Sequence, residues 1–292
     1  MRSEFEAVVD ELKRLKRTGV EYVYLEDKTI DLLDDLSKNP TGNANKPRGK
    51  IVSKENRKEY VKGSSEYRIP DALDIKLPHE NQLDNWNYLR NLVLNCKVCR
   101  QFVKPGKKVV FGVGDLDANV FFCGEAPGAD EETIGEPFVG KAGQLLTRII
   151  GAMGLQRDQV YITNIMNWRP ATESGFGNRP PNQDEMRFCL PYLKAQLEIV
   201  QPKVIIALGN TAVSGLLGPD PNRKMGAVRG KWFEYGGVPL LATYHPSYVL
   251  RNNLNETKRL IWSDMLQVME RIGMQASEVQ RGYFQNQDES PR

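Results

Sequence analysis

Long apolar runs are missing from this 292-residue chain. No stretch approaches the roughly 20 consecutive apolar residues that a membrane helix needs, and the first residues lack the apolar region of a signal peptide. The net charge of +3 is also small, so composition alone does not indicate a nucleic-acid partner. We therefore expect a cytoplasmic protein with no membrane partner. We also expect a monomer.

Cysteine and histidine are both scarce, with four cysteines and two histidines. Cys96 and Cys99 are separated by two residues, a spacing that suits a metal site or reduced thiols better than a disulfide framework. A disulfide-stabilised secreted domain is therefore not expected.

Composition divides the chain into three parts. Residues 1–80 form an N-terminal extension, in which apolar residues at helical spacing over 5–15 predict one amphipathic helix. Residues 34–74 are polar and basic, which is typical of a flexible linker. A solvated tether and a DNA-tethering arm are both open readings of this linker, and the tether is favoured. Residues 81–275 read as the folded domain, and residues 276–292 as a polar tail.

Short apolar runs alternate with amphipathic segments within the folded domain. The runs predict buried strands at residues 109–113, 119–123, 160–163, 204–208 and 240–244. Apolar residues at helical spacing predict helices at residues 142–153, 183–200, 211–217 and 256–272. Strands that alternate with helices favour an α/β domain with a parallel sheet covered on both faces. Ligands bind such sheets at the carboxyl ends of the strands, so the loops after Cys123, Thr163 and Tyr244 are the candidates.

The first of these loops contains glycines, several carboxylates and an aromatic residue. Glu125 and Glu131 can polarise water or oppose positive charge, and Phe138 offers a flat face on which a planar base can stack. The alternative is that the glycines only make turns and that Phe138 is a core residue. A single glycine-rich turn does not decide between these readings.

The second loop opens with Asn164, whose side-chain amide presents a donor and an acceptor together. That pair complements one edge of a pyrimidine such as uracil. The alternative is an Asx turn, which is the commoner role of asparagine at a strand end. Arg169 and Arg179 follow, and both are candidates for holding phosphates or for capping the adjacent helix.

The third loop carries His245, which can donate a hydrogen bond to an oxygen that gains negative charge as a leaving group departs. Ser247 and Arg251 suit phosphate contacts. The apolar and aromatic residues 248–250 suit a wedge that fills the gap left by a flipped nucleotide.

These motifs together resemble those of the family 4 uracil-DNA glycosylases. The resemblance rests on the run GEAPGADEETIGEPFVGKAGQLL, on VYITNI followed by RP and NRPP, and on HPSYVLR, and it extends from about residue 96 to about residue 269. It implies a three-layer α/β/α sandwich around a short central parallel sheet. It also implies hydrolytic removal of uracil from single- or double-stranded DNA, which leaves an abasic site for base-excision repair.

The resemblance assigns roles by position. Phe138 is similar to the stacking aromatic, Asn164 to the residue that reads uracil, and His245 to the stabiliser of the departing uracil oxygen. Ala126, whose backbone is expected to bind uracil, stands where the best-known branch of the superfamily has an aspartate that handles the attacking water. Water placement is therefore open between Glu125, Glu131 with help from Asn178, and the backbone. The expected DNA contacts are Lys141, Arg169, Ser247, Leu250 and Arg251.

Typical members of this family also hold a 4Fe-4S cluster through four cysteines. Cys96, Cys99 and Cys189 match three of these ligands, but Trp168 stands where the third in family order is expected. Two readings are open: a cluster with an incomplete cysteine set, or cysteines that pack as small apolar groups. The chemistry on uracil needs no metal in either case.

Two alternatives to a hydrolytic glycosylase remain at this point. A catalytically weak or inactive DNA-binding relative is suggested by Ala126 and by the incomplete cysteine set. A covalent cross-linking relative carries a histidine nucleophile in an insert after the second motif, whereas the corresponding residues 171–177 contain no histidine. Hydrolytic turnover is therefore expected.

Overall fold

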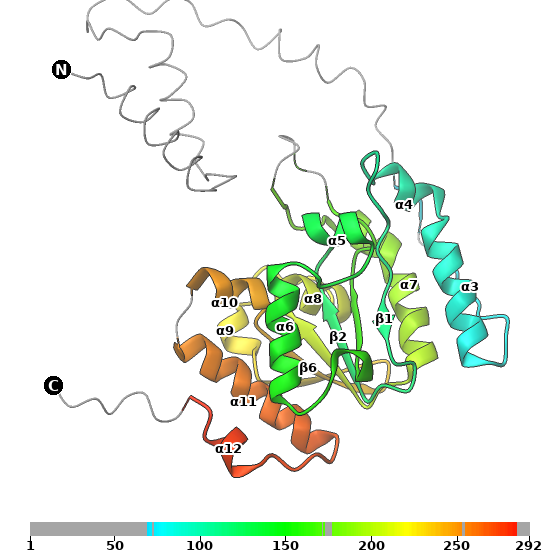
Figure 1. Cartoon of the computed structure of the whole chain (residues 1–292). Coiled ribbons are helices and arrows are strands. Elements are labelled where there is room, and N and C mark those ends of the chain that lie inside the picture. Colours follow the sequence, from blue (N-terminus) through cyan, green and yellow to red (C-terminus); the bar gives the residue numbers. More distant parts are fainter. Residues whose placement is uncertain (1–68, 72, 171, 173–176, 253–254, 285–292) are drawn as a thin grey trace, which may run out of the picture. The chain divides into compact units, whose positions relative to one another are not determined.

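The computed structural model describes residues 69–71, 73–170, 172, 177–252 and 255–284, all within one compact unit, Tyr67–Arg292 (Figure 1). The helix expected at residues 5–15, nearly all of the linker and residues 285–292 lie outside the described residues. Among the helices in the described ranges, none has the length and apolar character needed to cross a membrane.

The centre of this unit is a six-stranded sheet with the order β1-β3-β2-β4-β6-β5. The four inner strands run parallel, and β1 and β5 pair antiparallel at the two edges. The inner strands consist almost wholly of buried residues, as expected for strands that are covered on both faces. The bounds of the strands are Val113–Gly114, Val120–Gly124, Tyr161–Asn164, Val204–Leu208, Trp232–Tyr235 and Val238–Thr243 for β1 to β6.

The strand predicted at residues 109–113 is wrong except for Val113, the first residue of β1. The preceding residues are buried, but they join no continuous ladder. Val110 instead exchanges two hydrogen bonds with Asn167, one from its N–H to the backbone oxygen and one from the Asn167 side chain to its own carbonyl. An apolar run therefore signalled burial here and not a strand.

The edge strand β5 is absent from the sequence prediction. Its residues are mostly half-buried, so they form no continuous apolar run. Gly236 and Gly237 connect β5 to β6, with φ values of 59° and 82°. Two consecutive left-handed residues make the tight hairpin turn that a Gly-Gly pair favours, and this pair was the available signal for the strand.

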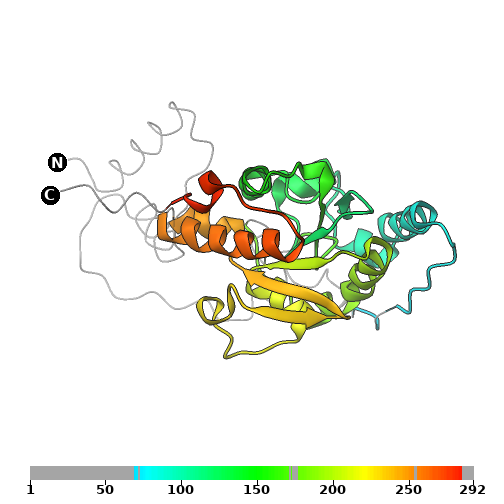
Figure 2. The ribbon, with the colours of Figure 1, turned by 90° about the horizontal axis from the view of Figure 1, so that it is seen from below.

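Helices cover both faces of the sheet, which confirms the three-layer α/β/α architecture (Figure 2). One face packs against α6 (Lys141–Ala152), α10 (Pro246–Asn252) and α11 (Asn255–Arg271). The other packs against α7 (Gln183–Val200) and α8 (Gly209–Leu217). Successive strand residues point to opposite faces, so Phe122 joins the first core and Phe121 the second.

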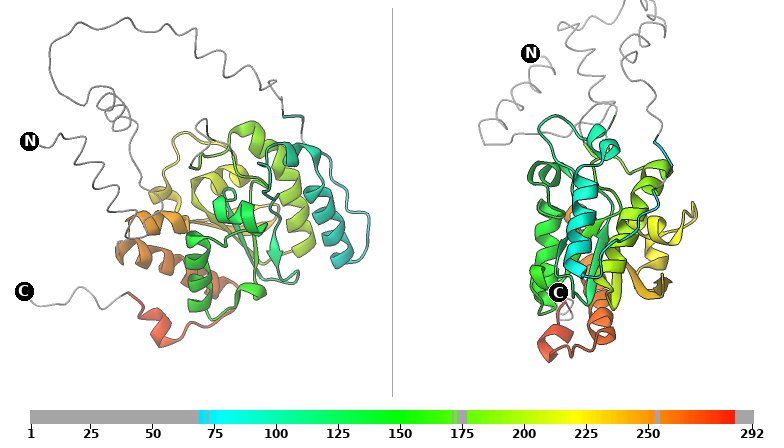
Figure 3. Two further views of the ribbon diagram at one scale, coloured as in Figure 1. Left: turned by 45° about the horizontal axis from the view of Figure 1, so that its top comes forward. Right: turned by 90° about the vertical axis from the view of Figure 1, so that its right-hand side faces the viewer.

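A third apolar cluster lies outside the sheet, where α3 (Gln82–Leu94) and α4 (Lys97–Gln101) pack on α7. Both views of Figure 3 show α3 beside α7. A relay of hydrogen bonds joins the layers, because Trp86 donates to the Tyr161 hydroxyl, which donates in turn to Gln196. The helix α3 therefore belongs to the folded domain.

The remaining described elements are short: α5 (Ala129–Ile134), η1 (Arg157–Gln159), α9 (Met225–Val228) and α12 (Glu278–Arg281). The last of these lies in the segment that the sequence assigns to a polar tail. Gln280 accepts a hydrogen bond from Trp262 at its backbone oxygen and donates from its side chain to the Ala152 carbonyl. Residues 277–284 are therefore attached to the domain.

The order of the parallel strands has one functional consequence. The chain passes from β2 to β3 on one side and then crosses to β4 and β6 on the other. The two directions diverge between β2 and β4, and ligands of open α/β sheets bind at the carboxyl ends of strands at such a switch point.

Candidate active site

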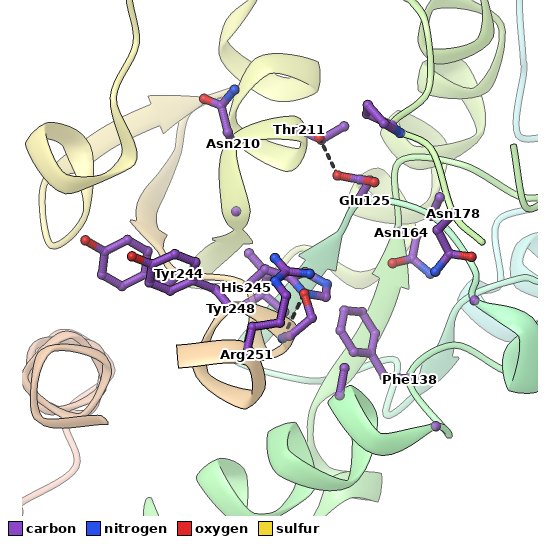
Figure 4. A pocket seen from close by; sticks show the side chains of 18 of the residues that line it. Glu125, Phe138, Asn164, Asn178, Asn210, Thr211, Tyr244, His245, Tyr248 and Arg251 are labelled. Atoms are coloured by element: carbon purple, nitrogen blue, oxygen red, sulfur yellow. Dashed lines mark hydrogen bonds between the residues drawn. The ribbon is translucent and has the colours of Figure 1, made fainter. Parts of the chain in front are cut away.

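A cavity of about 740 Å³ opens at the carboxyl ends of β2, β3, β4 and β6. This volume lies within the range of roughly 300–1,000 Å³ that is typical of small-molecule sites. Of the residues selected from the sequence, those that line the cavity are Glu125, Ala126, Glu131, Phe138, Lys141, Asn164, Asn178, Arg179, His245, Ser247, Tyr248 and Arg251. Figure 4 shows Glu125, Phe138, Asn164 and His245 around the same space. Arg169 and Leu250 are not among the lining residues.

Gly124, the last residue of β2, allows two of these side chains to approach each other. A Cβ atom at this position would stand 2.4 Å from Oδ1 of Asn164 and 2.4 Å from Cζ of Phe138. Both distances are far below van der Waals contact. Only glycine at position 124 therefore lets the amide and the ring lie together against the strand end.

The backbone of Phe138 is held in a left-handed conformation, with φ of 53°. Such a conformation is costly for a bulky residue and needs support from its surroundings. A Cβ at Gly143 would stand 1.8 Å from the Phe138 carbonyl oxygen, so α6 presses directly on this turn. Arg157 holds it from the other side by donating to the Pro137 carbonyl over 2.5 Å. The Phe138 side chain is 5% exposed, and its ring centroid lies 5.6 Å from that of His245.

Glu131 ties the two halves of the first loop together. Its Oε2 accepts the N–H of Gly128, and its Oε1 accepts the N–H groups of Val139 and Gly140, all within 3.0 Å. Both carboxylate oxygens are therefore engaged with the backbone. This arrangement supports a positioning role for Glu131, in which it fixes the turn that carries Phe138.

Asn164 ends β3 and is 4% exposed. Its Oδ1 is buried and has no hydrogen-bond partner among the described residues. An unpaired buried acceptor costs roughly 1–3 kcal/mol, and a ligand that brings an N–H donor removes this cost. The amide thus has an unused acceptor at the edge of a cavity.

His245 follows β6 and is fixed by Ser247. Nδ1 of His245 accepts the backbone N–H of Ser247 at 3.1 Å and lies 2.8 Å from its hydroxyl oxygen. Burial and, secondarily, the positive charge of Arg251 lower the pKa of His245 to about 4. The ring is therefore neutral at physiological pH, and because Nδ1 accepts, its proton is on Nε2.

Glu125 lies directly after β2 and is joined to the first turn of α8, which begins immediately after β4. Thr211 Oγ1 donates to Oε2 of Glu125 over 2.5 Å. Burial raises the pKa of Glu125, while the Thr211 hydrogen bond and the charge of Arg251 act in the opposite direction. Among the described residues the other oxygen, Oε1, makes no hydrogen bond, so it is available at the cavity.

The first turn of α8, which follows β4 directly, was not selected from the sequence as part of the site. Gly209, Asn210 and Thr211 line the cavity, and Tyr244, Met225 and Gly226 also do so. A signal for the first three was present, because they follow a correctly predicted buried strand. The rule that ligands sit at strand carboxyl ends applies to that strand as well as to the others.

The two arginines of the second motif are committed to internal contacts. Arg169 donates to Oδ1 of Asn178, to the Gly177 carbonyl and to the Glu132 carboxylate, at 2.7, 2.6 and 3.0 Å. Arg179 makes a bidentate pair with Glu185, at 2.7 Å for each bond. These contacts hold residues 177–180 at the rim of the cavity.

The rim next to α10 is apolar and exposed. Leu250 is 43% exposed, and Tyr248 is 39% exposed. Tyr248 stacks on Tyr244 with ring centroids 4.7 Å apart. Lys141 and Arg251 lie exposed nearby, at the start of α6 and within α10. This combination suits a partner with both aromatic and anionic groups.

A buried charge pair supports the end of β6, from which His245 projects. Asp264 of α11 is fully buried and accepts a hydrogen bond from Thr243, the last residue of β6, at 2.6 Å. Arg229 pairs with the same carboxylate and also donates to the Leu260 carbonyl. The carboxylate thus fixes the strand end and α11 together.

The cysteine positions do not fit a four-cysteine iron–sulfur cluster. Cys99 and Cys189 are buried near Cys96 in the cluster between α3, α4 and α7. Trp168 is fully buried there, and its ring stacks on Phe102 at 5.1 Å. An indole offers an N–H donor where a thiolate ligand is needed. Within the described ranges, no group of three or more His, Cys, Asp or Glu side chains is arranged to hold a metal ion.

Comparison with known proteins gives the same family on independent grounds. Residues 111–266 match the family model described as the uracil DNA glycosylase superfamily. A type-4 uracil-DNA glycosylase of Thermotoga maritima is 42% identical over 174 residues, which cover 59% of this chain and 87% of the relative. A type-4 enzyme of Pyrobaculum aerophilum is 43% identical over 169 residues, 56% and 83% of the two chains. A type-5 uracil-DNA glycosylase of the same organism is 30% identical over 221 residues, 64% and 91%.

Proposed function

This chain belongs to the uracil DNA glycosylase superfamily, with type-4 enzymes among its relatives, and we propose that it hydrolyses the bond between uracil and deoxyribose in DNA. The single observation that carries this proposal is the unpaired acceptor of Asn164 beside the Phe138 ring at the cavity. The chemistry uses protein side chains and water, and no step passes through a metal group.

Recognition of uracil depends on two groups. Oδ1 of Asn164 accepts the uracil N3–H, and the side-chain amide nitrogen donates to uracil O4. Cytosine has a ring nitrogen without a proton at the first place and an amino donor at the second, so both contacts become unfavourable. The Phe138 ring supplies a stacking face worth about 1–3 kcal/mol per base. The backbone at Ala126 lies at the same end of the cavity and completes the expected binding set.

The leaving group is stabilised by His245. As the N1–C1′ bond breaks, its electrons move onto uracil, and negative charge develops on O2. The neutral imidazole donates Nε2–H to that oxygen. A preformed donor of this kind is worth about 100- to 1,000-fold in rate. The low pKa of His245 means that the ring remains a hydrogen-bond donor and does not transfer a full proton to uracil.

Glu125 is the residue that activates the attacking water. The sugar becomes oxocarbenium-like, and the Glu125 carboxylate opposes that positive charge and orients the attacking water. The water oxygen bonds to C1′, one of its protons is released through Glu125, and the uracil anion is protonated from solvent. Glu131 is less suited to this role, because its carboxylate oxygens already accept three backbone N–H groups. Asn178 is held by Arg169 and is less suited for the same reason.

DNA is the proposed partner, with the target nucleotide flipped out of the stack. Base flipping costs a few kcal/mol, which stacking and hydrogen bonding in the cavity offset. Lys141, Ser247 and Arg251 are the proposed phosphate contacts, and exposed Leu250 with Tyr248 is the proposed wedge. Several expectations from the sequence stay predictions. They are the phosphate contact of Arg169, the role of the N-terminal extension, and the protein's role in base-excision repair, its monomeric state and its cytoplasmic location.

The test is incubation of the purified chain with a uracil-containing oligonucleotide, followed by alkali. Strand scission at uracil supports a glycosylase, and release of free uracil identifies hydrolysis. An adduct that survives denaturing electrophoresis would instead indicate the covalent relative. Binding without scission would indicate an inactive DNA-binding relative.

A further inference from the structure

A second hollow, of about 570 Å³, lies between α3, α4, the segment 103–109 and the end of α5. We call it the basic groove, because five cationic side chains and one carboxylate line it: Arg90, Arg100, Lys104, Lys107, Lys108 and Glu136. In Figure 1, α4 and α5 lie at the same end of the molecule. The catalytic proposal makes no use of this hollow.

Most of these cations are fixed by neutral groups. Arg100 donates to the Leu94 carbonyl and to the Asn95 side chain, at 2.8 and 3.0 Å. Lys107 lies 2.7 Å from the Thr133 hydroxyl, and Lys108 donates to the Ile134 carbonyl at 3.0 Å. Neutral partners orient a cation and leave its charge uncompensated.

Two further contacts are consistent with a net positive charge in the groove. Arg90 lies over the ring of Trp86, 5.8 Å from its centroid, which is again a contact with a neutral group. Glu136, the one carboxylate that lines the groove, interacts electrostatically with Arg157 on the other side of its loop. The groove therefore presents organised positive charge.

The short helix α5 connects this groove with the candidate active site. Ala129, Asp130 and Glu131, at its start, line the catalytic cavity, and Ile134, at its end, lines the groove. Six residues of α-helix span about 9 Å. One strand of stacked nucleic acid advances about 3.4 Å per nucleotide, so this distance corresponds to roughly three nucleotides.

We propose that the basic groove binds the phosphates of the DNA strand that carries the flipped nucleotide, two to three nucleotides away from it. The inference rests on the proposed function, because it takes DNA as the substrate. Contacts of this kind fix the position of a strand and contribute affinity without reading its sequence. They also make binding dependent on salt.

The test compares two double variants of equal charge change. Lys104→Ser/Lys107→Ser removes two groove cations. Lys194→Ser/Lys203→Ser removes two exposed cations that line neither the groove nor the catalytic cavity, one from α7 and one from the position just before β4. Melting temperatures verify that both variants are folded.

Binding is measured with a uracil-free, fluorescent single strand of about 30 nucleotides, so that the result does not depend on catalysis. We expect the groove variant to bind about tenfold more weakly than the wild type and to lower the slope of log K against log salt by about 1.4. The control variant should change neither. Equal losses in the two variants, or an unchanged slope in the groove variant, would overturn the proposal.

Catalysis separates this proposal from the one on which it rests. A trinucleotide with uracil at its centre extends only one nucleotide to either side and so reaches the cavity but not the groove, and the groove variant should cleave it at the wild-type rate. If the groove variant lost cleavage rate equally on the trinucleotide and on the long strand, the defect would lie in the cavity, and the proposal that the groove binds DNA would be overturned. If the wild type cleaves no uracil substrate, the proposed function fails, while the uracil-free binding experiment still decides whether the groove holds DNA.

Discussion

Thr211, in the first turn of α8, holds the Glu125 carboxylate across the switch point of the sheet, between the carboxyl ends of β2 and β4. The contact joins a residue of the first motif to a helix that belongs to none of the motifs. It fixes one carboxylate oxygen and leaves the other for water. The hydroxyl also lowers the pKa of Glu125 against the larger effect of burial, which raises it.

Thr211→Val should therefore change the pH dependence of the single-turnover rate. The carboxylate is the active form, so the rate falls as pH falls through the pKa of Glu125. Removing the donor raises that pKa further, and the acid limb should move to higher pH, with a rate loss of about 10- to 100-fold. Thr211→Ser retains the hydroxyl and should keep the wild-type profile. An unchanged acid limb in Thr211→Val would show that Thr211 does not control the pKa of the catalytic carboxylate.

Glu125→Gln tests the carboxylate itself. The amide does not titrate, so the remaining activity should show no acid limb down to about pH 4, where His245 becomes protonated. We expect a rate loss of at least about 100-fold, which is typical for the loss of a general base. Retention of the wild-type acid limb in this variant would assign the limb to another group.

Asn164→Asp and Asn164→Leu separate recognition from stability. Both should lower kcat/KM on uracil DNA by about 100-fold or more, because a site built around hydrogen bonds loses its selective contacts. Asn164→Leu also removes a buried acceptor that has no partner, so its melting temperature should not fall. A large drop in melting temperature for Asn164→Leu would mean that the amide serves the fold.

His245→Ala should reduce the single-turnover rate by about 100- to 1,000-fold with little loss of DNA affinity. His245→Gln keeps an N–H donor and should recover part of the rate. The rate of the wild type should respond little to His245 between neutral pH and about pH 5, since the ring is neutral there. Wild-type turnover in His245→Ala would remove this residue from the mechanism.

Trp168 offers a test of the cysteine cluster. We expect anaerobically purified wild-type protein to lack the broad visible absorbance of an iron–sulfur cluster, because an indole occupies the place of one ligand. Trp168→Cys supplies the missing thiol and should gain this absorbance after reconstitution with iron and sulfide. Trp168→Phe, which supplies no ligand, is the matched control. Stoichiometric iron in the wild type would contradict this reading.

Much of the central fold was predictable, because continuous apolar runs mark strands that are buried on both faces. The run at residues 204–208 became β4 without any change of bounds, and the helix at 183–200 became α7. The amphipathic strand β5 and the short helices lack such a signal. Residues 109–112 show the converse error, since they are buried but form no strand ladder, and Val110 instead pairs with Asn167.

The site was predictable to the extent that each motif follows a strand. Phe138, Asn164 and His245 do line one cavity. Hydrogen-bond partners were not predictable, because they depend on which loops meet in space. The hydrogen bonds from the backbone of its own loop to the Glu131 carboxylate are one example, and the expected place of Glu131 in the chemistry stays a prediction. The contacts of Arg169 with residues 177–178 are a second example, and its expected role at phosphates stays a prediction.

The ion pair below the end of β6 restricts how this part of the chain can vary. Replacing Arg229 alone would leave the Asp264 carboxylate buried without its cationic partner. Replacing Asp264 alone would remove the carboxylate that accepts from the Arg229 guanidinium and from the Thr243 hydroxyl. A library randomised at both positions and sorted for folded protein should therefore retain both charges or neither. Residues 229 and 264 must therefore change together, although they lie 35 positions apart.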